Sequence, residues 1–310
     1  MAGRMRWFDR RAFGQAVRAA AQWRLLLLWV GVSWLPAAIV ALPLWRALGG
    51  LLDHSVHAQA WAGRLDVLAF GDTLRALAPA SGMLAGSAIV GLLATVLLNP
   101  FLNGMAVGSA LAGRSPGFAD LLRHGVVQYP RMFRLLLWSV LVYGAVAAVA
   151  AGALALAGDV ARRALLESSA DRALGLAVAA IAVLYLLVQV VLDGARAAFM
   201  VDAGLGSARR ALGRGIRLLR RPLPTLGYFL AVSVAGYAAA LVLALLRAQL
   251  PRGHVIELGL ALLLAQLIVL AIGWTHVARL FVLAVVARGQ PWEPATPGAE
   301  AASPAVPAGG

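Results

Sequence analysis

Six stretches of mostly apolar residues, each about 20 residues long, recur along almost the whole of this 310-residue chain. A bilayer core about 30 Å thick is crossed by about 20 residues of α-helix, since each residue rises about 1.5 Å. Lipid offers no partner to backbone N–H and C=O groups, which excludes isolated strands. The sequence therefore predicts an all-α polytopic membrane helix bundle with about six transmembrane helices. The predicted spans are residues 25–45, 83–103, 135–157, 174–193, 225–246 and 256–276.

The composition excludes a soluble globular fold. Hydrophobic residues make up 62% of the chain and charged residues 13%, whereas soluble domains have about half and about a quarter. The first apolar run, residues 25–44, is longer than the core of a signal peptide, so we expect it to remain as the first span. The chain has no cysteine, which excludes disulfides, thiolate metal sites and thiol nucleophiles.

All 27 basic residues are arginines, and they are divided unequally between the two sides of the predicted bundle. The N-terminus, residues 104–134, residues 194–224 and the C-terminus carry 19 of them and form what we call the basic side. Residues 46–82, 158–173 and 247–255 carry the other 8, offset by acidic residues, and form the far side. Arginine-rich segments stay in the cytoplasm, so we expect both termini to be cytoplasmic. A basic chain rich in alanine and glycine is typical of a GC-rich genome, and we expect a bacterial inner (cytoplasmic) membrane.

Three basic-side segments, residues 8–24, 116–134 and 205–222, mix arginines with spaced apolar residues and lead directly into a span. This pattern predicts amphipathic helices in the headgroup layer that contact anionic lipid. In the third segment the predicted apolar face consists of Ala208, Leu212, Ile216 and Leu219. The candidate lipid contacts there are Arg209, Arg210, Arg214, Arg217, Arg220 and Arg221.

The far side contains the longest connecting segment, residues 46–82, whose leucine spacing predicts a short amphipathic helix on the outer surface. The tail, residues 289–310, is rich in proline, alanine and glycine, which predicts disorder. Two small-residue pairs, Gly82 with Gly86 and Gly104 with Gly108, flank the second span and predict close helix packing.

Polar residues from three spans are predicted to lie at one depth near the basic side. The candidate polar layer is Asn99, Asn103, Asp193, Arg196, His276 and Arg279. Asp193 and Arg196 are three residues apart on a helix, so they can form an ion pair. One interpretation is a vestibule through which a substrate enters from the cytoplasm, and the other is a structural clamp. We favour the clamp, because intramembrane charges that carry a transport function usually lie deeper in the bilayer.

The sequence contains no signature of catalysis. It has no Gly-x-Ser-x-Gly elbow, no phosphate-binding loop and no His-Glu-x-x-His. Asp53, His54 and His57 have metal-ligand chemistry but lack a third convincing ligand nearby. We therefore expect no enzyme activity, no cofactor and no metal. The arginine-rich segments lack interleaved aromatic residues, so we expect membrane lipid, not nucleic acid, as their partner.

The segments 193–202 (Asp-Gly-Ala-Arg-Ala-Ala-Phe-Met-Val-Asp) and 99–105 (Asn-Pro-Phe-Leu-Asn-Gly-Met) resemble patterns in uncharacterised bacterial six-helix membrane proteins. In layout the chain is similar to the membrane domain fused to some glycerophosphodiester phosphodiesterases. It has no phosphodiesterase domain, so the resemblance implies no catalysis. We expect a non-catalytic accessory or membrane-organising component. The alternative is a transporter or lipid-handling protein with a cytoplasmic-side polar vestibule, and a protein partner or homo-oligomer stays open.

Overall fold

The computed structural model describes residues 10–53, 55, 67–112, 116–163, 166–250 and 255–289. Within these ranges the backbone is helical almost throughout and contains no strand, which confirms the all-α prediction. The elements in chain order are α1 (Arg10–Ala20), α2 (Trp23–Leu52), α4 (Val67–Ala76), the 3₁₀ turn η1 (Ala78–Ala80), α5 (Ser81–Leu111), α6 (Phe118–Arg163), α7 (Glu167–Val201), α8 (Ala208–Leu218), α9 (Pro222–Gln249) and α10 (Val255–Arg288).

Six of these helices are long and apolar enough to cross a membrane: α2, α5, α6, α7, α9 and α10. Each of them contains one predicted span, so the six-span prediction is confirmed and the chain is a multi-pass membrane protein. The helices are longer than the predicted spans, because good helix formers such as alanine and leucine continue beyond the most apolar stretch. Thus α10 continues from the predicted end of its span at 276 to Arg288.

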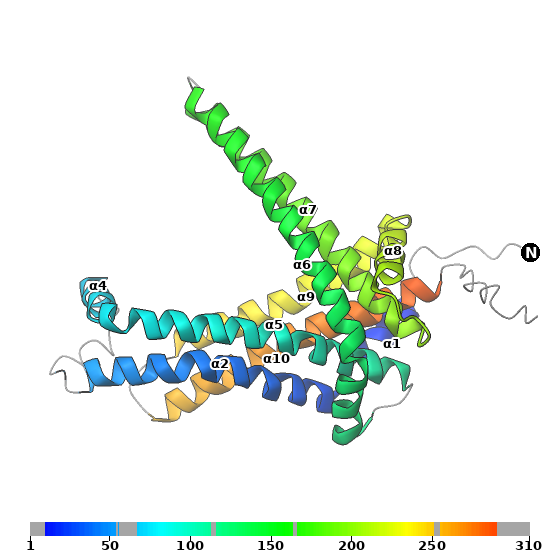
Figure 1. Cartoon of the computed structure of the whole chain (residues 1–310), viewed down its shortest axis with the longest axis horizontal. Helices are drawn as coiled ribbons and strands as arrows, with labels where there is room; N and C mark the ends of the chain where they lie inside the picture. Colours follow the sequence, from blue (N-terminus) through cyan, green and yellow to red (C-terminus); the bar gives the residue numbers. More distant parts are fainter. Residues whose placement is uncertain are drawn as a thin grey trace, which may run out of the picture.

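The long helices form three antiparallel pairs in chain order: α2 with α5, α6 with α7, and α9 with α10. Four of them, α2, α5, α9 and α10, lie alongside one another, whereas the α6–α7 hairpin diverges from them toward its tip (Figure 1). The burial of side chains agrees with this picture, since no described residue of α7 before Val190 is buried. The far half of the hairpin therefore presents its apolar side chains to lipid.

Buried residues gather at the basic side of the long helices. In α7 the buried positions lie between residues 190 and 200, and in α10 between 273 and 286. In α5 all but one of them lie between residues 100 and 109. The short helices complete this core, because α1 packs against α10 and α8 packs against α7. The described part of the bundle thus has its hydrophobic core at the basic side, and on the far side the α6–α7 hairpin diverges from the other long helices.

Two of the three predicted headgroup-layer helices are separate elements, α1 and α8, whereas the second segment is continuous with its span. Residues 118–134 form the first part of α6, which continues through Pro130 without a break into the span. No connecting residues separate the two parts, and the N-terminal part of α6 packs against α5. On the far side, α4 confirms the predicted short helix. Residues 290–310 of the tail lie outside the described residues.

The glycine pairs flanking the second span have different environments. A Cβ added at Gly104 would lie 2.9 Å from the backbone oxygen of Gly125, and one at Gly108 would collide with His124. Close packing of α5 on α6 is therefore confirmed at this pair. The prediction is wrong for Gly82 and Gly86, which have no atom within 4 Å of an added Cβ. They lie in the far half of α5, beyond the core.

Candidate functional site

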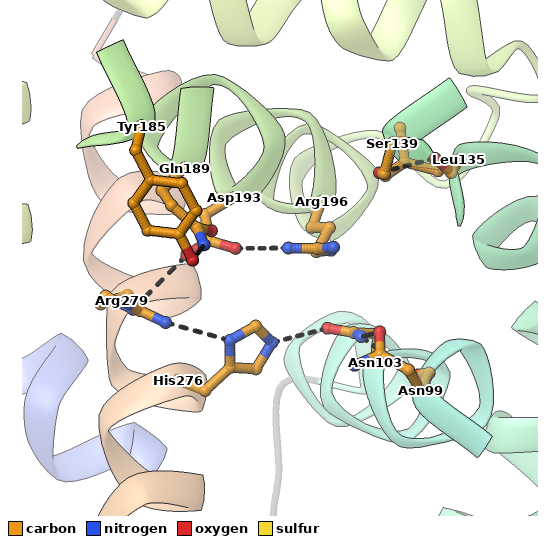
Figure 2. Close-up of polar contacts among 10 residues, drawn as sticks. All are labelled: Asn99, Asn103, Leu135, Ser139, Tyr185, Gln189, Asp193, Arg196, His276 and Arg279. Carbon is orange, nitrogen blue, oxygen red and sulfur yellow. Dashed lines mark hydrogen bonds and ion pairs between the residues drawn. The ribbon is translucent and has the colours of Figure 1, made fainter. Parts of the chain in front are cut away.

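The six residues of the predicted polar layer lie close together, and Asn103, Asp193 and Arg279 are buried (Figure 2). They come from helices that run in the same direction, from the far side to the basic side, so the ends of these helices are level. The contributing residues are Asn99 and Asn103 from α5, Asp193 and Arg196 from α7, and His276 and Arg279 from α10.

A chain of hydrogen bonds joins α5 to α10. The Nδ2 group of Asn103 donates to Asn99 Oδ1 at 2.7 Å and to the Asn99 carbonyl oxygen at 2.8 Å. The Oδ1 atom of Asn103 lies 2.8 Å from Nε2 of His276, so Nε2 carries the proton, because an amide oxygen only accepts. The other ring nitrogen, Nδ1, lies 3.3 Å from Nη2 of Arg279 and accepts from it, because a guanidinium only donates. His276 is therefore neutral in this arrangement.

Asp193 joins α7 to α10 through two guanidinium groups. Its Oδ1 atom accepts a hydrogen bond of 2.6 Å from Nη1 of Arg196, one turn further along α7. Its Oδ2 atom lies 3.4 Å from Nε of Arg279 on α10, as an ion pair without hydrogen-bond geometry. The Arg279 guanidinium also lies over the ring of Phe229 on α9, 5.0 Å from its centroid, which is a cation–π contact. One carboxylate thus connects α7 with α10, and Arg279 extends the contact to α9.

Little of the layer is exposed. Asp193 is fully buried and Asn103 is 1% exposed, and the side chains of Arg196 and Arg279 are only 12% and 10% exposed. Leaving one member of such a buried ion cluster without its partner costs about 3–5 kcal/mol. The layer can therefore hold three helices at a fixed relative depth. Both ring nitrogens of His276 are engaged, so in this arrangement the ring is not poised as a base or a metal ligand.

Several neighbours of the layer could not be identified from the sequence. Phe229 is one, and Trp29 of α2 is another, since its ring centroid lies 5.5 Å from that of His276. No local pattern connects these residues to the layer, because they come from helices distant in the chain. Tyr185 and Gln189 could be paired from the sequence, because residues four apart are neighbours on a helix. In the structure Gln189 Nε2 donates to the Tyr185 hydroxyl at 2.6 Å (Figure 2).

The residues that the structure describes contain no group of three or more His, Asp or Glu side chains that could hold a metal ion. His54 and His57, the histidines of the far-side segment considered above, lie outside the described residues.

The six arginines of the basic helix region around α8 differ in their surroundings. Arg209, Arg210, Arg217 and Arg220 are exposed. Among them, Arg209 lies over the Trp138 ring, 5.3 Å from its centroid. Within the described part of the chain, neither Arg210 nor Arg220 has a hydrogen-bonding or ion-pair partner for its side chain.

The other two arginines of this region contact the protein. Arg214 forms an ion pair of 3.0 Å with Asp202, and its side chain is only 15% exposed. Partial burial lowers the pKa of the Arg214 guanidinium, and Asp202 acts in the opposite direction. Arg221 donates to the Gly289 carbonyl oxygen at 3.1 Å. These two arginines therefore connect elements of the basic side, whereas the other four are exposed.

The face of α8 that packs on the protein is not the same as the predicted apolar face. Ala208, Ala211, Gly215 and Leu218 are buried, whereas Ile216, on the predicted face, is 58% exposed. The reason is close helix packing, since a Cβ at Gly215 would collide with the Val191 carbonyl oxygen of α7. Small residues therefore decide which face of α8 meets α7, and the larger apolar residue Ile216 is left on the outside.

No protein-family model, no curated protein and no solved structure matches this chain. The similarity in layout to the membrane domain of some glycerophosphodiester phosphodiesterases therefore stays a prediction.

Proposed function

We propose that this protein is a non-catalytic component of a bacterial inner membrane, with both termini cytoplasmic, that organises anionic lipid around its basic side. The observation that carries this proposal is the position of α8. Its small-residue face packs on α7, and its exposed arginines point away from the core. Each arginine close to an anionic leaflet contributes about 1 kcal/mol of attraction. A rigid core thus holds a cationic surface at the depth of the headgroups.

The polar layer supports this proposal as a structural element. Asp193 and its two guanidinium partners connect helices that also support α8 and α1, so the layer keeps the cationic surface in place. The low exposure of its side chains favours a clamp over a vestibule.

The proposal is tested by measuring the lipid that surrounds the protein. The full chain is extracted from membranes of mixed composition in polymer nanodiscs, and the co-extracted lipid is quantified. We expect anionic lipid to be enriched around the wild type. Replacing the four exposed arginines of the α8 region with glutamine should reduce that enrichment. The test variant carries Arg209→Gln, Arg210→Gln, Arg217→Gln and Arg220→Gln.

A matched control removes the same charge from the far side. The control variant carries Arg75→Gln, Arg162→Gln, Arg163→Gln and Arg172→Gln, all at exposed positions. If anionic lipid falls equally in both variants, the enrichment reflects net charge and the proposal is wrong.

A transporter or lipid-handling protein is the second candidate, and one observation favours it. The layer holds two guanidinium groups and one carboxylate, so it carries an excess positive charge among side chains that are at most 12% exposed. A buried excess charge is a feature of substrate and ion pathways. Flux of anionic solutes or lipids in proteoliposomes, lost in Arg279→Gln while the protein still inserts, would establish this function instead.

A further inference from the structure

A pocket of about 770 Å³ lies at the basic side, where α1 and the start of α2 meet the ends of α5 and α10. This volume falls within the range of about 300–1,000 Å³ typical of small-molecule sites. Part of its wall is apolar, with Ala16 from α1 and Phe281 and Val285 from α10. The polar side chains of Arg18, Gln22 and Arg288 also line the pocket.

Two arginines bring uncompensated charge to the pocket. Arg18 lies in the last turn of α1 and Arg288 in the last turn of α10. Neither side chain has a hydrogen-bonding or ion-pair partner among the described residues, and none of those that line the pocket is acidic. Both positions are exposed, so the arginines are not required to fill the core. The charge of the pocket therefore favours an anion.

Gln22 and Trp23, at the start of α2, also line the pocket. Gln22 is the N-cap residue of α2, but its side chain does not cap the helix. The first backbone N–H group with an acceptor is that of Leu26, which donates to the Gln22 carbonyl oxygen at 3.0 Å. Within the described chain, the N–H groups of Trp23, Arg24 and Leu25 have no acceptor, and Trp23 is the residue of these three that lines the pocket. Free N–H groups at the positive end of a helix are a common phosphate-binding arrangement.

A third group specifies more than negative charge. The Oε1 atom of Gln22 is buried and has no hydrogen-bond partner among the described residues, while its Nε2 group donates to the Ala19 carbonyl oxygen at 3.0 Å. A buried acceptor without a partner costs about 1–3 kcal/mol, so a ligand that supplies a donor is favoured. The pocket thus matches a phosphate group that is joined to a hydroxyl-bearing group.

We propose that this pocket binds the headgroup of a phospholipid with a hydroxyl-bearing phosphodiester, of the phosphatidylglycerol class. Arg18, Arg288 and the start of α2 would hold the phosphate, and Gln22 would accept a hydrogen bond from the headgroup hydroxyl. The apolar wall and the exposed Trp23, a residue enriched at membrane interfaces, favour a lipid over a soluble phosphate. This inference rests on the proposed function, in that the basic side faces anionic lipid.

The experiment uses the full chain in detergent, titrated with phospholipids of equal chain length and followed by native mass spectrometry. The lipids are phosphatidylglycerol, phosphatidylmethanol, which has the same charge but no hydroxyl, and phosphatidylcholine. Soluble glycerol 3-phosphate is added as a competitor. We expect one tightly retained phosphatidylglycerol, weaker retention of phosphatidylmethanol, and no displacement by glycerol 3-phosphate.

The double variant Arg18→Gln with Arg288→Gln should weaken this binding. Each arginine removed should raise the Kd about tenfold or more, because tenfold corresponds to the weakest hydrogen bonds made by charged groups. The matched control, Arg163→Gln with Arg172→Gln, removes the same charge from exposed far-side positions and should change binding less than about threefold. The variant Gln22→Leu should abolish the preference for phosphatidylglycerol over phosphatidylmethanol. It also tests the pocket without a change of charge, should the double variant fold poorly.

Equal weakening in the two arginine double variants would overturn the pocket site, as would equal retention of all three lipids. Displacement by glycerol 3-phosphate would overturn the lipid as the source of the phosphate. The proposed function fails separately, if the α8 variant and its far-side control enrich anionic lipid equally. Loss of enrichment in the α8 variant together with unchanged binding in the pocket variants leaves the proposed function standing and the pocket inference refuted.

Discussion

Replacing Asp193 with asparagine should strongly destabilise the protein, although the side chain keeps its shape. The substitution removes the only carboxylate of the layer and leaves the guanidiniums of Arg196 and Arg279 without an anion, at distances that were 2.6 and 3.4 Å. Breaking a buried ion pair on one side costs about 3–5 kcal/mol. At about 2–4 °C for each kcal/mol in a chain of this size class, the midpoint of unfolding should fall by roughly 6–20 °C.

The midpoint is measured by near-ultraviolet circular dichroism of the purified protein in detergent, at one fixed scan rate. The chain contains a matched control in Asp159, which pairs with Arg162 at the same spacing of three residues. The side chains of that pair are 51% and 74% exposed, and an exposed pair contributes at most about 1 kcal/mol. Asp159→Asn should therefore lower the midpoint by less than about 4 °C.

A second substitution tests the reason for the loss. If the unpaired guanidinium of Arg279 causes it, then Asp193→Asn combined with Arg279→Gln should lose less than the sum of the single variants, with a coupling of about 0.5–3 kcal/mol. A loss in Asp193→Asn no larger than in Asp159→Asn would refute the clamp, and additive losses in the double variant would refute the role of Arg279 in it.

Three further predictions use the same measurement or simple labelling. Gly215→Ala should destabilise the protein by about 1–3 kcal/mol because α8 must move away from α7, whereas Gly213→Ala, with no atom within 4 Å of an added Cβ, should stabilise it by up to about 1 kcal/mol; equal effects would contradict close packing at Gly215. Asn103→Ala should cost about 1–3 kcal/mol because the histidine N–H loses its acceptor, and a midpoint within 1 °C of the wild type's, measured as above, would contradict the hydrogen-bond chain. In this cysteine-free chain, a membrane-impermeant thiol reagent added to whole cells with a permeable outer membrane should label Ala76→Cys and not Gly206→Cys, and the opposite pattern would reverse the orientation.

The parts of this structure that follow from local pattern could be predicted from the sequence. Hydropathy alone locates the six spans, because the bilayer imposes both a length and a helical backbone on each. The common depth of the polar layer follows from the alternating direction of the spans, since the second, fourth and sixth all end at the basic side. The ion pair of Asp193 with Arg196 follows from helical spacing.

The parts that depend on contacts between distant residues could not be predicted in this way. The second partner of Asp193, Arg279, lies on a helix 86 residues further along the chain, and no periodicity connects the two. The face of α8 that packs on α7 is decided by the close approach at Gly215, which hydrophobicity does not indicate. The divergence of the α6–α7 hairpin has no local signal either, because a lipid-facing helix and a core-facing helix are both apolar along their length.

The location of the core at the basic side has a consequence for synthesis of the protein. Of the six long helices α10 is made last, and it contributes the buried positions between residues 273 and 286 and the surface on which α1 packs. Domains acquire their tertiary contacts only when all their segments have left the ribosome. The nascent chain should therefore exist as separate inserted hairpins, with the apolar face of α1 resting on lipid, until α10 arrives. A ribosome that stalls before α10 would leave Asp193 with Arg196 but without Arg279, and such a product should be the form that membrane proteases remove.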